Sequence, residues 1–292
     1  MDAHGRGRQN GARTCRRGPT MTPTIDILIV NYNNREDLAG CLASLEAARP
    51  AALGRIIVAD NGSTDDSVAY VTATWPHVEV LALGRNLGFA AANNAAIRAA
   101  TAPLVLLLNS DTIAPAGAID GLAARLEATG AVAAGPLLVD GDGHPEVSFG
   151  PMLSPLAELC QSLRVRLARS DAAIARRWIG RLVGRERTVD WISGGCLLVR
   201  RQAALDAGLL DERYFLYEED VDFCEALRRQ GGRILFTPRA RIIHLRGRSV
   251  RRTGTRPTAH YDRSHLLFYD KHLPRWAPVL RWWLRVRGRN VR

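Results

Sequence analysis

The sequence lacks any apolar run approaching the about 20 residues that a helix needs to cross a bilayer. Its first residues are rich in Arg and Gly without an apolar stretch, so we expect no secretory signal. Five cysteines, an odd number without a CxxC pair, argue against a disulfide framework or a zinc site and favour a reducing compartment. Lys271 is the only lysine, so arginine carries nearly all of the basic charge.

That charge is unevenly distributed along the chain. The net charge of +11 is made of +4 in residues 1–20, +11 in residues 246–292 and −4 in residues 21–245. An acidic body, without an aromatic and basic pattern outside the tail, predicts that nucleic acid is not a partner. A nucleic-acid-binding protein that uses its basic ends stays open as an alternative. Residues 1–22 are predicted to be a disordered arm.

Residues 23–112 alternate between strand-like and helix-like segments. Ordinary proportions of hydrophobic (47%) and charged (24%) residues predict a globular protein. Alternation of this kind predicts an α/β fold, a parallel sheet with helices on both faces. The expected strands are 25–30, 55–60, 78–83 and 104–108, and the expected helices are 37–48, 65–74 and 88–100.

Three polar clusters follow three of these strands, at 31–34, 60–63 and 109–112. Ligands of open α/β sheets gather at the carboxyl ends of the strands, where these clusters fall. Each cluster alone is an ordinary turn, but the three together favour a binding site.

The second half, residues 113–245, is less regular. Residues 164–187 hold eight Arg against two acids, which predicts a basic amphipathic insertion on the surface or against a membrane or acceptor. A strand is expected over 190–200, broken at Gly194-Gly195, where the backbone can approach a ligand closely. The other expected elements are a helix over 221–229 and short strands at 234–236 and 241–243, the last ending at His244.

Four acids lie within residues 218–222. Such close packing of like charges costs free energy unless a cation, a helix N-terminus or a substrate compensates. A solvated, acid-capped helix is the simpler interpretation. The aromatic neighbours Phe215, Tyr217 and Phe223 instead indicate partial burial, and a partly buried carboxylate with a raised pKa is a candidate general base.

Two further residues could bind a metal. Asp111 follows an apolar strand, as acids that bind Mg²⁺ or Mn²⁺ beside a phosphate often do. His244, at another strand end, is the most plausible nitrogen ligand, although a single His in such a place is more often a packed or surface residue.

Seven short motifs occur in an order that resembles the family 2 glycosyltransferases of the GT-A fold, in particular the bacterial rhamnosyltransferase-like branch. The resemblance covers roughly residues 24–250 and implies an α/β fold with one mixed, mostly parallel sheet flanked by helices. The motifs lie at 30–33, 60–65, 86–90 with Asn93, 109–112, 194–200, 215–222 and His244.

This resemblance implies the roles of the donor-binding residues. Asp60 matches the aspartate that binds the imide N–H of uracil or thymine, and Asn31 and Asn33 line the same nucleotide pocket. Near the diphosphate or sugar, the resemblance places Arg85 and Asn86, with Asn93 in the same motif.

The resemblance also implies the metal ligands and the base. Asp111 matches the last position of the family's DxD motif, while its first position is Asn109, a departure that either weakens metal binding or alters the ribose contact. His244 completes the shell of a Mn²⁺ or Mg²⁺ ion. Asp220 matches the catalytic base, with Glu219 beside it.

The implied reaction is transfer of a sugar with inversion at the anomeric carbon. The donor is dTDP-rhamnose or a UDP-sugar, and the acceptor is a hydroxyl of a lipid-linked or cell-surface polysaccharide. A leaving nucleoside diphosphate needs a divalent cation, and the acceptor hydroxyl needs a base. A nucleotidyltransferase of similar architecture is the enzymatic alternative, but residues 30–34 lack the glycine-rich phosphate loop that it requires.

The segment 246–292 is predicted to be a basic amphipathic tail. Residues 274–286 interleave three Trp with three Arg, which suits the interface of an anionic bilayer. A helix packed on the body, with its Arg in solvent, is the alternative. We expect the enzyme at the inner, cytoplasmic face of the plasma membrane as a peripheral protein.

Overall fold

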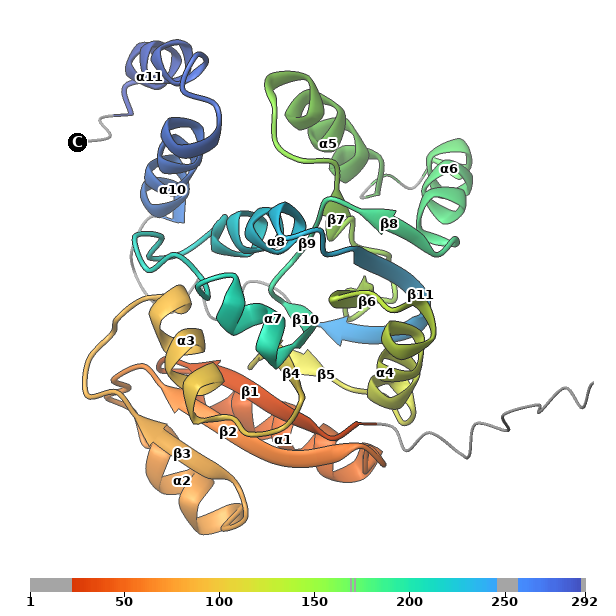
Figure 1. Cartoon of the computed structure of the whole chain (residues 1–292), viewed down its shortest axis with the longest axis vertical. Helices are drawn as coiled ribbons and strands as arrows, with labels where there is room; N and C mark the ends of the chain where they lie inside the picture. The colour runs from red at the N-terminus through yellow and green to blue at the C-terminus, as the bar shows by residue number, and fades with distance from the viewer. Residues whose placement is uncertain (1–22, 169, 171, 246–256, 290–292) are drawn as a thin grey trace, which may run out of the picture.

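The computed structural model describes residues 23–168, 170, 172–245 and 257–289 and is dominated by one twisted sheet (Figure 1). Within this part of the chain the sheet has nine strands in the order β3-β2-β1-β4-β10-β6-β11-β5, with β8 paired to β11. Its strands are β1 (Ile25–Asn31), β2 (Leu53–Asp60), β3 (Glu79–Ala82), β4 (Leu104–Asn109), β5 (Thr112–Ile113), β6 (Ala133–Val139), β8 (Arg187–Val189), β10 (Cys196–Arg200) and β11 (Ile234–His244). A small second sheet pairs β7 (Phe149–Gly150) with β9 (Trp191–Ile192).

The sheet is mixed and mostly parallel, which confirms the predicted fold class. The neighbours β1–β2, β1–β4, β2–β3 and β6–β11 are parallel, whereas β10 runs antiparallel to both β4 and β6. The parallel pairing of β1 with β2 and β4 aligns Asn31 with Asp60 and Val30 with Asn109. The polar clusters that follow these strands therefore share one edge of the sheet.

Helices cover both faces of the sheet, so its central strands are buried on both sides. Ile27 and Ile29 pack on one face, in a cluster that includes residues of α1, α2 and α4, while Leu28 packs on the other, with residues of α3, α6, α7 and α8. This double burial explains the uninterrupted apolar runs of the strands. The helices are α1 (Arg35–Ala48), α2 (Ser67–Thr74), α3 (Phe89–Ala99), α4 (Ala118–Thr129), α5 (Pro155–Ala168), α6 (Ala173–Val183), α7 (Arg201–Asp206), α8 (Glu219–Arg229), α10 (Pro257–His272) and α11 (Ala277–Val286).

Several elements differ from the sequence-based expectation. The two short strands expected around 234–243 are one strand, β11, whose pairing with β6 shifts register between Thr237 and Arg241. Pro238 lies in this interval and cannot donate a backbone hydrogen bond, which accounts for the irregularity. The basic stretch 164–187 divides between the end of α5, α6 and β8.

The C-terminal helices are partly packed on the body. Phe268 and Tyr269 of α10 lie in a buried cluster with Tyr214 and Val221. The tail boundary expected at residue 246 stays a prediction, because residues 246–256 lie outside the described part, as does the expected arm of residues 1–22. Among the described helices, none has the length and apolar character of a membrane span.

Candidate donor and catalytic site

Asn31 and Asp60 form a buried polar pair at the ends of β1 and β2. Asn31 Nδ2 donates to Asp60 Oδ1 (3.1 Å) and to Ser63 Oγ (3.1 Å), and the Ser63 N–H donates to Asp60 Oδ2 (2.9 Å). Both side chains are almost inaccessible, with Asn31 0% and Asp60 3% exposed. Because a carboxylate can accept about four hydrogen bonds, Asp60 keeps acceptor capacity for a base imide.

Asn33 joins the two loops that follow these strands. It has a left-handed backbone (φ 49°), and its Oδ1 accepts the N–H groups of Thr64 (2.6 Å) and Asp65 (3.3 Å). Its own N–H donates to Ser63 Oγ (2.9 Å). In this structure the amide of Asn33 therefore shapes the loop.

Asn86 and Asn93 are likewise held by hydrogen bonds to nearby segments of the chain. Asn86 Oδ1 accepts from Asn61 Nδ2 (2.9 Å) and from the Gly88 N–H (3.0 Å), and Asn93 Nδ2 donates to the Phe89 carbonyl (2.9 Å). Arg85 is exposed beside the turn at Gly62, whose left-handed φ of 77° brings it against the Arg85 backbone. A Cβ on Gly62 would lie 2.5 Å from the Arg85 Cα, so only glycine fits there.

The structure brings Asp111 and His244 together. The short strand β5 follows Asp111 and pairs antiparallel with the end of β11, so that Thr112 stands opposite His244. Asp111 Oδ1 lies 3.2 Å from His244 Nε2, and Asn109 Nδ2 lies 3.4 Å from the same nitrogen. Glu146 Oε2 lies 3.2 Å from His244 Nδ1.

The charge around His244 is strongly anionic. Burial opposes protonation, but hydrogen bonds to Asp111 and Glu146 outweigh it and raise the pKa of His244 to about 9. Sequence analysis missed Glu146, which lies in an irregular segment between β6 and β7 and belongs to none of the motifs.

These residues fit a divalent cation. Two ligand atoms bound at right angles, each about 2.1 Å from one ion, lie about 3 Å apart, close to the observed Asp111–His244 separation. A metal-bound histidine usually bonds through its other ring nitrogen to a carboxylate, and Glu146 occupies that position on His244. Two protein ligands leave coordination positions for phosphate and water.

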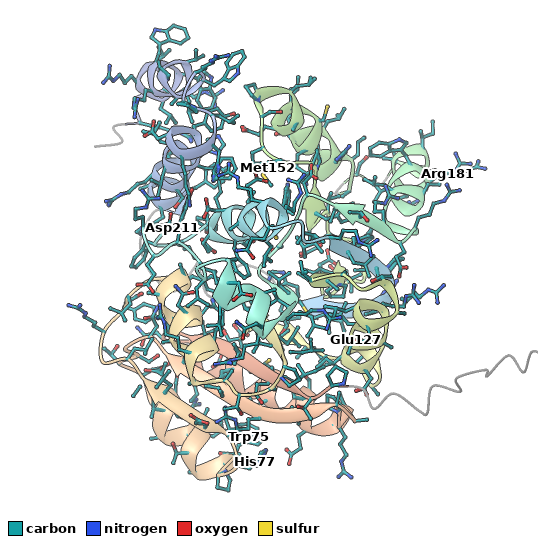
Figure 2. The ribbon with its side chains drawn as sticks, viewed as in Figure 1. Trp75, His77, Glu127, Met152, Arg181 and Asp211 are labelled. Atoms are coloured by element: carbon teal, nitrogen blue, oxygen red, sulfur yellow. The ribbon has the colours of Figure 1, made fainter. Side chains whose placement is uncertain are left out.

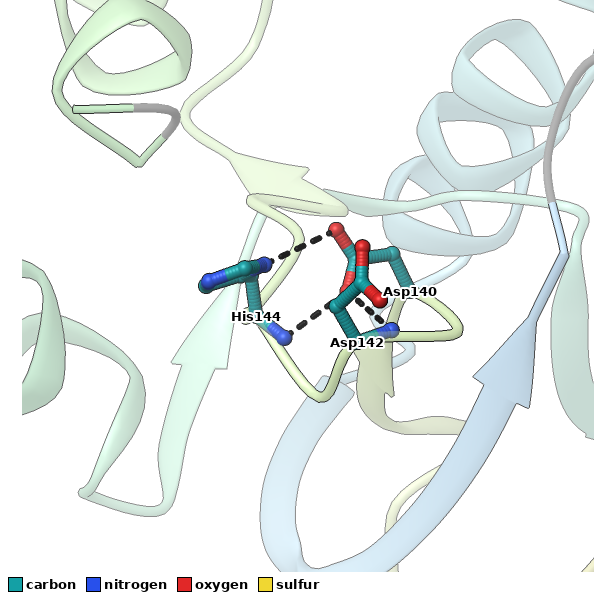
Figure 3. Close-up of side chains that lie close together, drawn as sticks. All are labelled: Asp140, Asp142 and His144. Carbon is teal, nitrogen blue, oxygen red and sulfur yellow. Dashed lines mark hydrogen bonds and ion pairs between the residues drawn. The ribbon is translucent and has the colours of Figure 1, made fainter. Parts of the chain in front are cut away.

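A second cluster of metal-binding side chain types lies in a turn at the surface (Figure 3). Asp140 Oδ1 accepts the N–H groups of Asp142 (3.0 Å) and His144 (2.8 Å), and its Oδ2 lies 3.3 Å from His144 Nδ1. These bonds account for the cluster as a polar turn. We assign no function to it.

Asp220 lies in the first turn of α8 and bonds to the glycine pair. Its Oδ2 accepts the Gly194 N–H (2.7 Å), and its Oδ1 accepts the Val221 N–H (2.8 Å). Burial raises the pKa of Asp220 above its ordinary value, although these backbone hydrogen bonds oppose the change. Asp220 is therefore held in place in a form that gains a proton more readily than a free aspartate.

The glycine pair lies between Asp220 and the Asp111–His244 pair. A Cβ on Gly194 would lie 3.3 Å from Asp220 Cβ, and a Cβ on Gly195 would lie 3.5 Å from His244 Cε1. The Gly195 carbonyl accepts the Asn109 N–H (3.1 Å). The backbone of these two residues thus links the candidate base to the candidate metal ligands.

Glu219, directly before Asp220, is also buried, with 5% of its surface exposed. Its Oε2 has no hydrogen-bond partner among the described residues. Burial, together with the negative charge of Asp220, raises the pKa of Glu219 well above its ordinary value. Glu219 therefore gains a proton more readily than a free glutamate does.

The two flanking acids bond to basic side chains of α10, which are partners that the sequence alone could not identify. Glu218 bonds to His265 Nδ1 (2.6 Å). Asp222 bonds to Lys271 Nζ (2.8 Å) and His272 Nε2 (2.6 Å).

Comparison with known proteins gives the family. The family model described as glycosyl transferase family 2 matches residues 26–167. The chain is 35% identical over 283 residues to the N-acetylglucosaminyl-diphospho-decaprenol L-rhamnosyltransferase of Mycobacterium tuberculosis, covering 91% of this chain and 90% of the relative. It is 26% identical over 224 residues to the low-salt glycan biosynthesis hexosyltransferase Agl10 of Haloferax volcanii, covering 74% of this chain and 66% of the relative. The chain therefore belongs to the family 2 glycosyltransferases, in their rhamnosyltransferase-like branch.

Solved structures show the same fold. The structure of GalNAc-T7 with UDP, GalNAc and Mn²⁺ superposes with a TM-score of 0.60 at 18% identity, covering 85% of this chain and 48% of that one. The Pyrobaculum calidifontis mannosyltransferase PcManGT with GDP-Man and Mn²⁺ gives a TM-score of 0.57 at 17% identity, covering 90% and 69%. The GT-A fold is thereby confirmed. Membership of a glycosyltransferase family sets aside the nucleotidyltransferase and nucleic-acid-binding alternatives.

Proposed function

We propose that this glycosyltransferase inverts the configuration of a sugar as it moves it from a nucleoside-diphosphate donor to an acceptor hydroxyl. The proposal rests on the position of the glycine pair, Gly194-Gly195. Gly194 bonds to Asp220, and Gly195 lies against His244 of the Asp111–His244 pair. The name of the mycobacterial relative favours rhamnose as the transferred sugar and a lipid-linked acceptor before a cell-surface polysaccharide. We propose dTDP-rhamnose as the donor, before UDP-sugars.

Asp220 is proposed as the base. It accepts the proton of the acceptor hydroxyl, whose oxygen attacks the anomeric carbon as the bond to the diphosphate breaks on the opposite side. The pKa of Glu219 is raised further than that of Asp220, so Asp220 is the more readily ionised acid of the pair. When two neighbouring acids have different pKa values, the acid that ionises more readily is the one able to act as the base. Here that acid is Asp220.

Residues 23–112, predicted to be the nucleotide-sugar-binding half and called the donor half here, are assigned their roles from the positions of the strand ends. Asp60 would bind the imide edge of the nucleobase in a pocket lined by Asn31 and Asn33, while Arg85, Asn86, Asn93 and Asn109 would lie near the ribose, diphosphate or sugar. Asp111 and His244 would hold Mn²⁺ or Mg²⁺. When bound, the cation would neutralise charge on the departing diphosphate.

A panel of nucleotide sugars tests the donor assignment. We expect dTDP-rhamnose with Mn²⁺ to raise the Tm more than UDP- or GDP-sugars, since a ligand that binds only the folded state stabilises it. Asp60→Asn should weaken protection by dTDP- and UDP-sugars alike, because both bases present the same imide N–H and an amide nitrogen replaces one of its acceptors. Equal protection by all nucleotides, unchanged in Asp60→Asn, would contradict the nucleobase assignment.

The proposed membrane contact involves more than the C-terminal segment. Val279, Trp282 and Val286 form an exposed stripe along α11 (52%, 64% and 67% exposed), opposite the buried Leu284. Exposed apolar residues also line α5 and α6, which lie at the same end of the molecule as α11 (Figure 1). These are Leu156, Leu159 and Leu163 on α5, and Ile174 and Trp178 on α6.

Arginines accompany these apolar stripes. Arg181 extends outward from α6 (Figure 2), and residues 172–185 and 271–289 contain no acid. Exposed Trp and Leu interleaved with Arg are complementary to an anionic bilayer. We accordingly place α5, α6 and α11 on the cytoplasmic face of the plasma membrane, next to the lipid-linked acceptor.

Binding to vesicles tests this surface. Trp282→Asp should lower partitioning onto vesicles containing phosphatidylglycerol by about 10-fold or more, because burying one large apolar side chain contributes about 1.5–3 kcal/mol. His77→Asp adds the same charge at an exposed position on the opposite end of the molecule (Figure 2) and should leave partitioning unchanged. Equal partitioning of Trp282→Asp and the unmodified protein would refute the surface.

A further inference from the structure

The segment 215–218, directly before Glu219 and Asp220, has an unusual backbone. Tyr217 (φ 72°) and Glu218 (φ 63°) are consecutive non-glycine residues in the left-handed region. Such conformations persist only where surrounding contacts hold them in place, and they occur often at functional sites. The contacts that hold this segment therefore also set where α8 begins.

One face of α10 contacts all four residues of this segment. Ser264 Oγ donates to the Leu216 carbonyl (2.7 Å) and His265 Nδ1 bonds to Glu218 Oε1 (2.6 Å). The ring of His260 stacks on Phe215 (4.9 Å between centroids), and that of Tyr261 meets Tyr217 edge-on (6.0 Å). Residues at such helical spacing share one side of a helix.

Segment 215–218 also contacts the donor half. The Phe215 carbonyl accepts the Phe89 N–H at the start of α3 (2.8 Å), and a Cβ on Gly88 would lie 2.6 Å from the same oxygen. The face of α10 thus lies behind a segment that contacts both the donor half and the candidate base.

His265 is the buried ionic centre of this face, with 6% of its surface exposed. Its Nε2 lies 3.1 Å from Glu158 Oε2 on α5, and Tyr269 donates to the other oxygen of Glu158. Burial opposes charge on the ring, but hydrogen bonds to Glu158 and Glu218 raise the pKa of His265 to about 10. At neutral pH a charged imidazole therefore lies between the carboxyl groups of Glu158 on α5 and Glu218 directly before α8, although burial raises the pKa of Glu218.

We propose that His265 is a positioning residue for catalysis, which holds Glu218 in its left-handed conformation and so fixes Asp220 against Gly194. It acts through Glu218 and touches no substrate. The identity of Asp220 as the base rests on the proposed function. The contacts by which α10 supports segment 215–218 do not depend on the proposed function.

The same helix supplies a matched control at its other end. His272 Nε2 bonds to Asp222 (2.6 Å), two residues after Asp220, and its side chain is 8% exposed, like that of His265. Both histidines join α10 to α8, but only His265 contacts the segment before the base. A role in packing α10 predicts similar effects for the two substitutions, whereas positioning predicts different ones.

We therefore compare His265→Gln with His272→Gln in the full-length protein. His265→Gln should lower kcat by about 10-fold or more while the KM for donor changes less than about 3-fold, because small displacements of a catalytic group cost up to about 10²-fold in rate. His272→Gln should lower the Tm without a comparable loss of kcat. If His265→Gln and His272→Gln lowered the Tm equally and also lowered kcat equally, the proposal would be overturned.

A double-mutant cycle locates the effect in the His265–Glu218 pair. If His265 acts through Glu218, His265→Gln should lower kcat little further when Glu218→Gln is already present. Full additivity would reject the coupling. Should His265→Gln fail to fold, Ser264→Ala, which removes the bond to Leu216 alone, should lower kcat about 3-fold, and an unchanged kcat would count against the proposal.

This test is separable from the assignment of the base. If Asp220→Asn retained activity, the base would be misassigned, while a selective effect of His265→Gln on kcat would still identify segment 215–218 as a determinant of the rate.

Discussion

Asp220→Asn is expected to lower kcat by about 10²–10⁴-fold, the range that a general base contributes. The amide keeps the size of the side chain but cannot accept the proton of the acceptor hydroxyl. Donor binding should persist, because Asp220 bonds to Gly194 and Val221 and not to the Asn31–Asp60 pair. The measurement is acceptor-dependent release of nucleoside diphosphate, with donor affinity determined separately by calorimetry.

The control and the pH dependence sharpen this prediction. Glu225→Gln changes an acid on the same helix that pairs with Arg228 and Arg229, and it should leave kcat near that of the unmodified enzyme. The base must be ionised to act, and the pKa of Asp220 is raised. As the pH is lowered, kcat should therefore fall at a pH above the ordinary pKa of an aspartate. Loss of donor binding in Asp220→Asn would show that its role is misassigned.

Asp111→Ala is expected to lower metal-dependent activity by about 10²–10⁴-fold, since charge stabilisation by a bound cation is worth several kcal/mol. Removing its carboxylate leaves His244 as the remaining assigned ligand. Activity titrated with Mn²⁺, together with calorimetric titration of Mn²⁺ in the presence of nucleoside diphosphate, measures the effect.

Asp140→Ala is the matched control, because Asp140 belongs to the surface turn of Figure 3 and should leave the Mn²⁺ titration unchanged. Undiminished activity of the unmodified enzyme in excess chelator would contradict the metal assignment. A loss of Mn²⁺ response in Asp140→Ala alone would move the metal site to the turn.

Another acid in the structure partly compensates for Asn109, the residue that departs from the DxD motif. Asn109 supplies no negative charge, but Glu146 places a carboxylate on the far side of His244. Bonding to Glu146 makes the imidazole a stronger electron donor, which favours a cation at its other nitrogen. The loss of one acid at Asn109 is thus partly offset from another segment.

The elements that form the donor half could be predicted from the sequence because their determinants are local. Apolar runs that end in polar residues, as at Asn31 and Asp60, define buried parallel strands, and parallel pairing then places their ends together. The proximity of Asp111 and His244 followed from resemblance to the family, since β5 and β11 carry no local sign of their pairing. Glu146 stayed undetected for the same reason.

The long-range ionic contacts of α10 could not be predicted either. Glu218 and His265 lie 47 positions apart, and no periodicity connects them. The acid cluster indicated that some cation must compensate it, without showing which one. Likewise the alternation of Trp and Arg predicted an amphipathic segment, but only the structure separates the packed α10 from the exposed stripe of α11.

The scarcity of lysine gives one of these contacts a practical value. Lys271 carries the sole side-chain amine of the chain, and that amine is bound to Asp211 (2.8 Å) and Asp222 (2.8 Å). An acylating reagent reacts with the neutral, unbound amine, so modification at this residue requires that Lys271 Nζ leave both carboxylates, by rotation of its side chain or by movement of α10. The rate of acylation at Lys271 therefore reports how often this ionic contact of α10 opens, without any label having to be introduced.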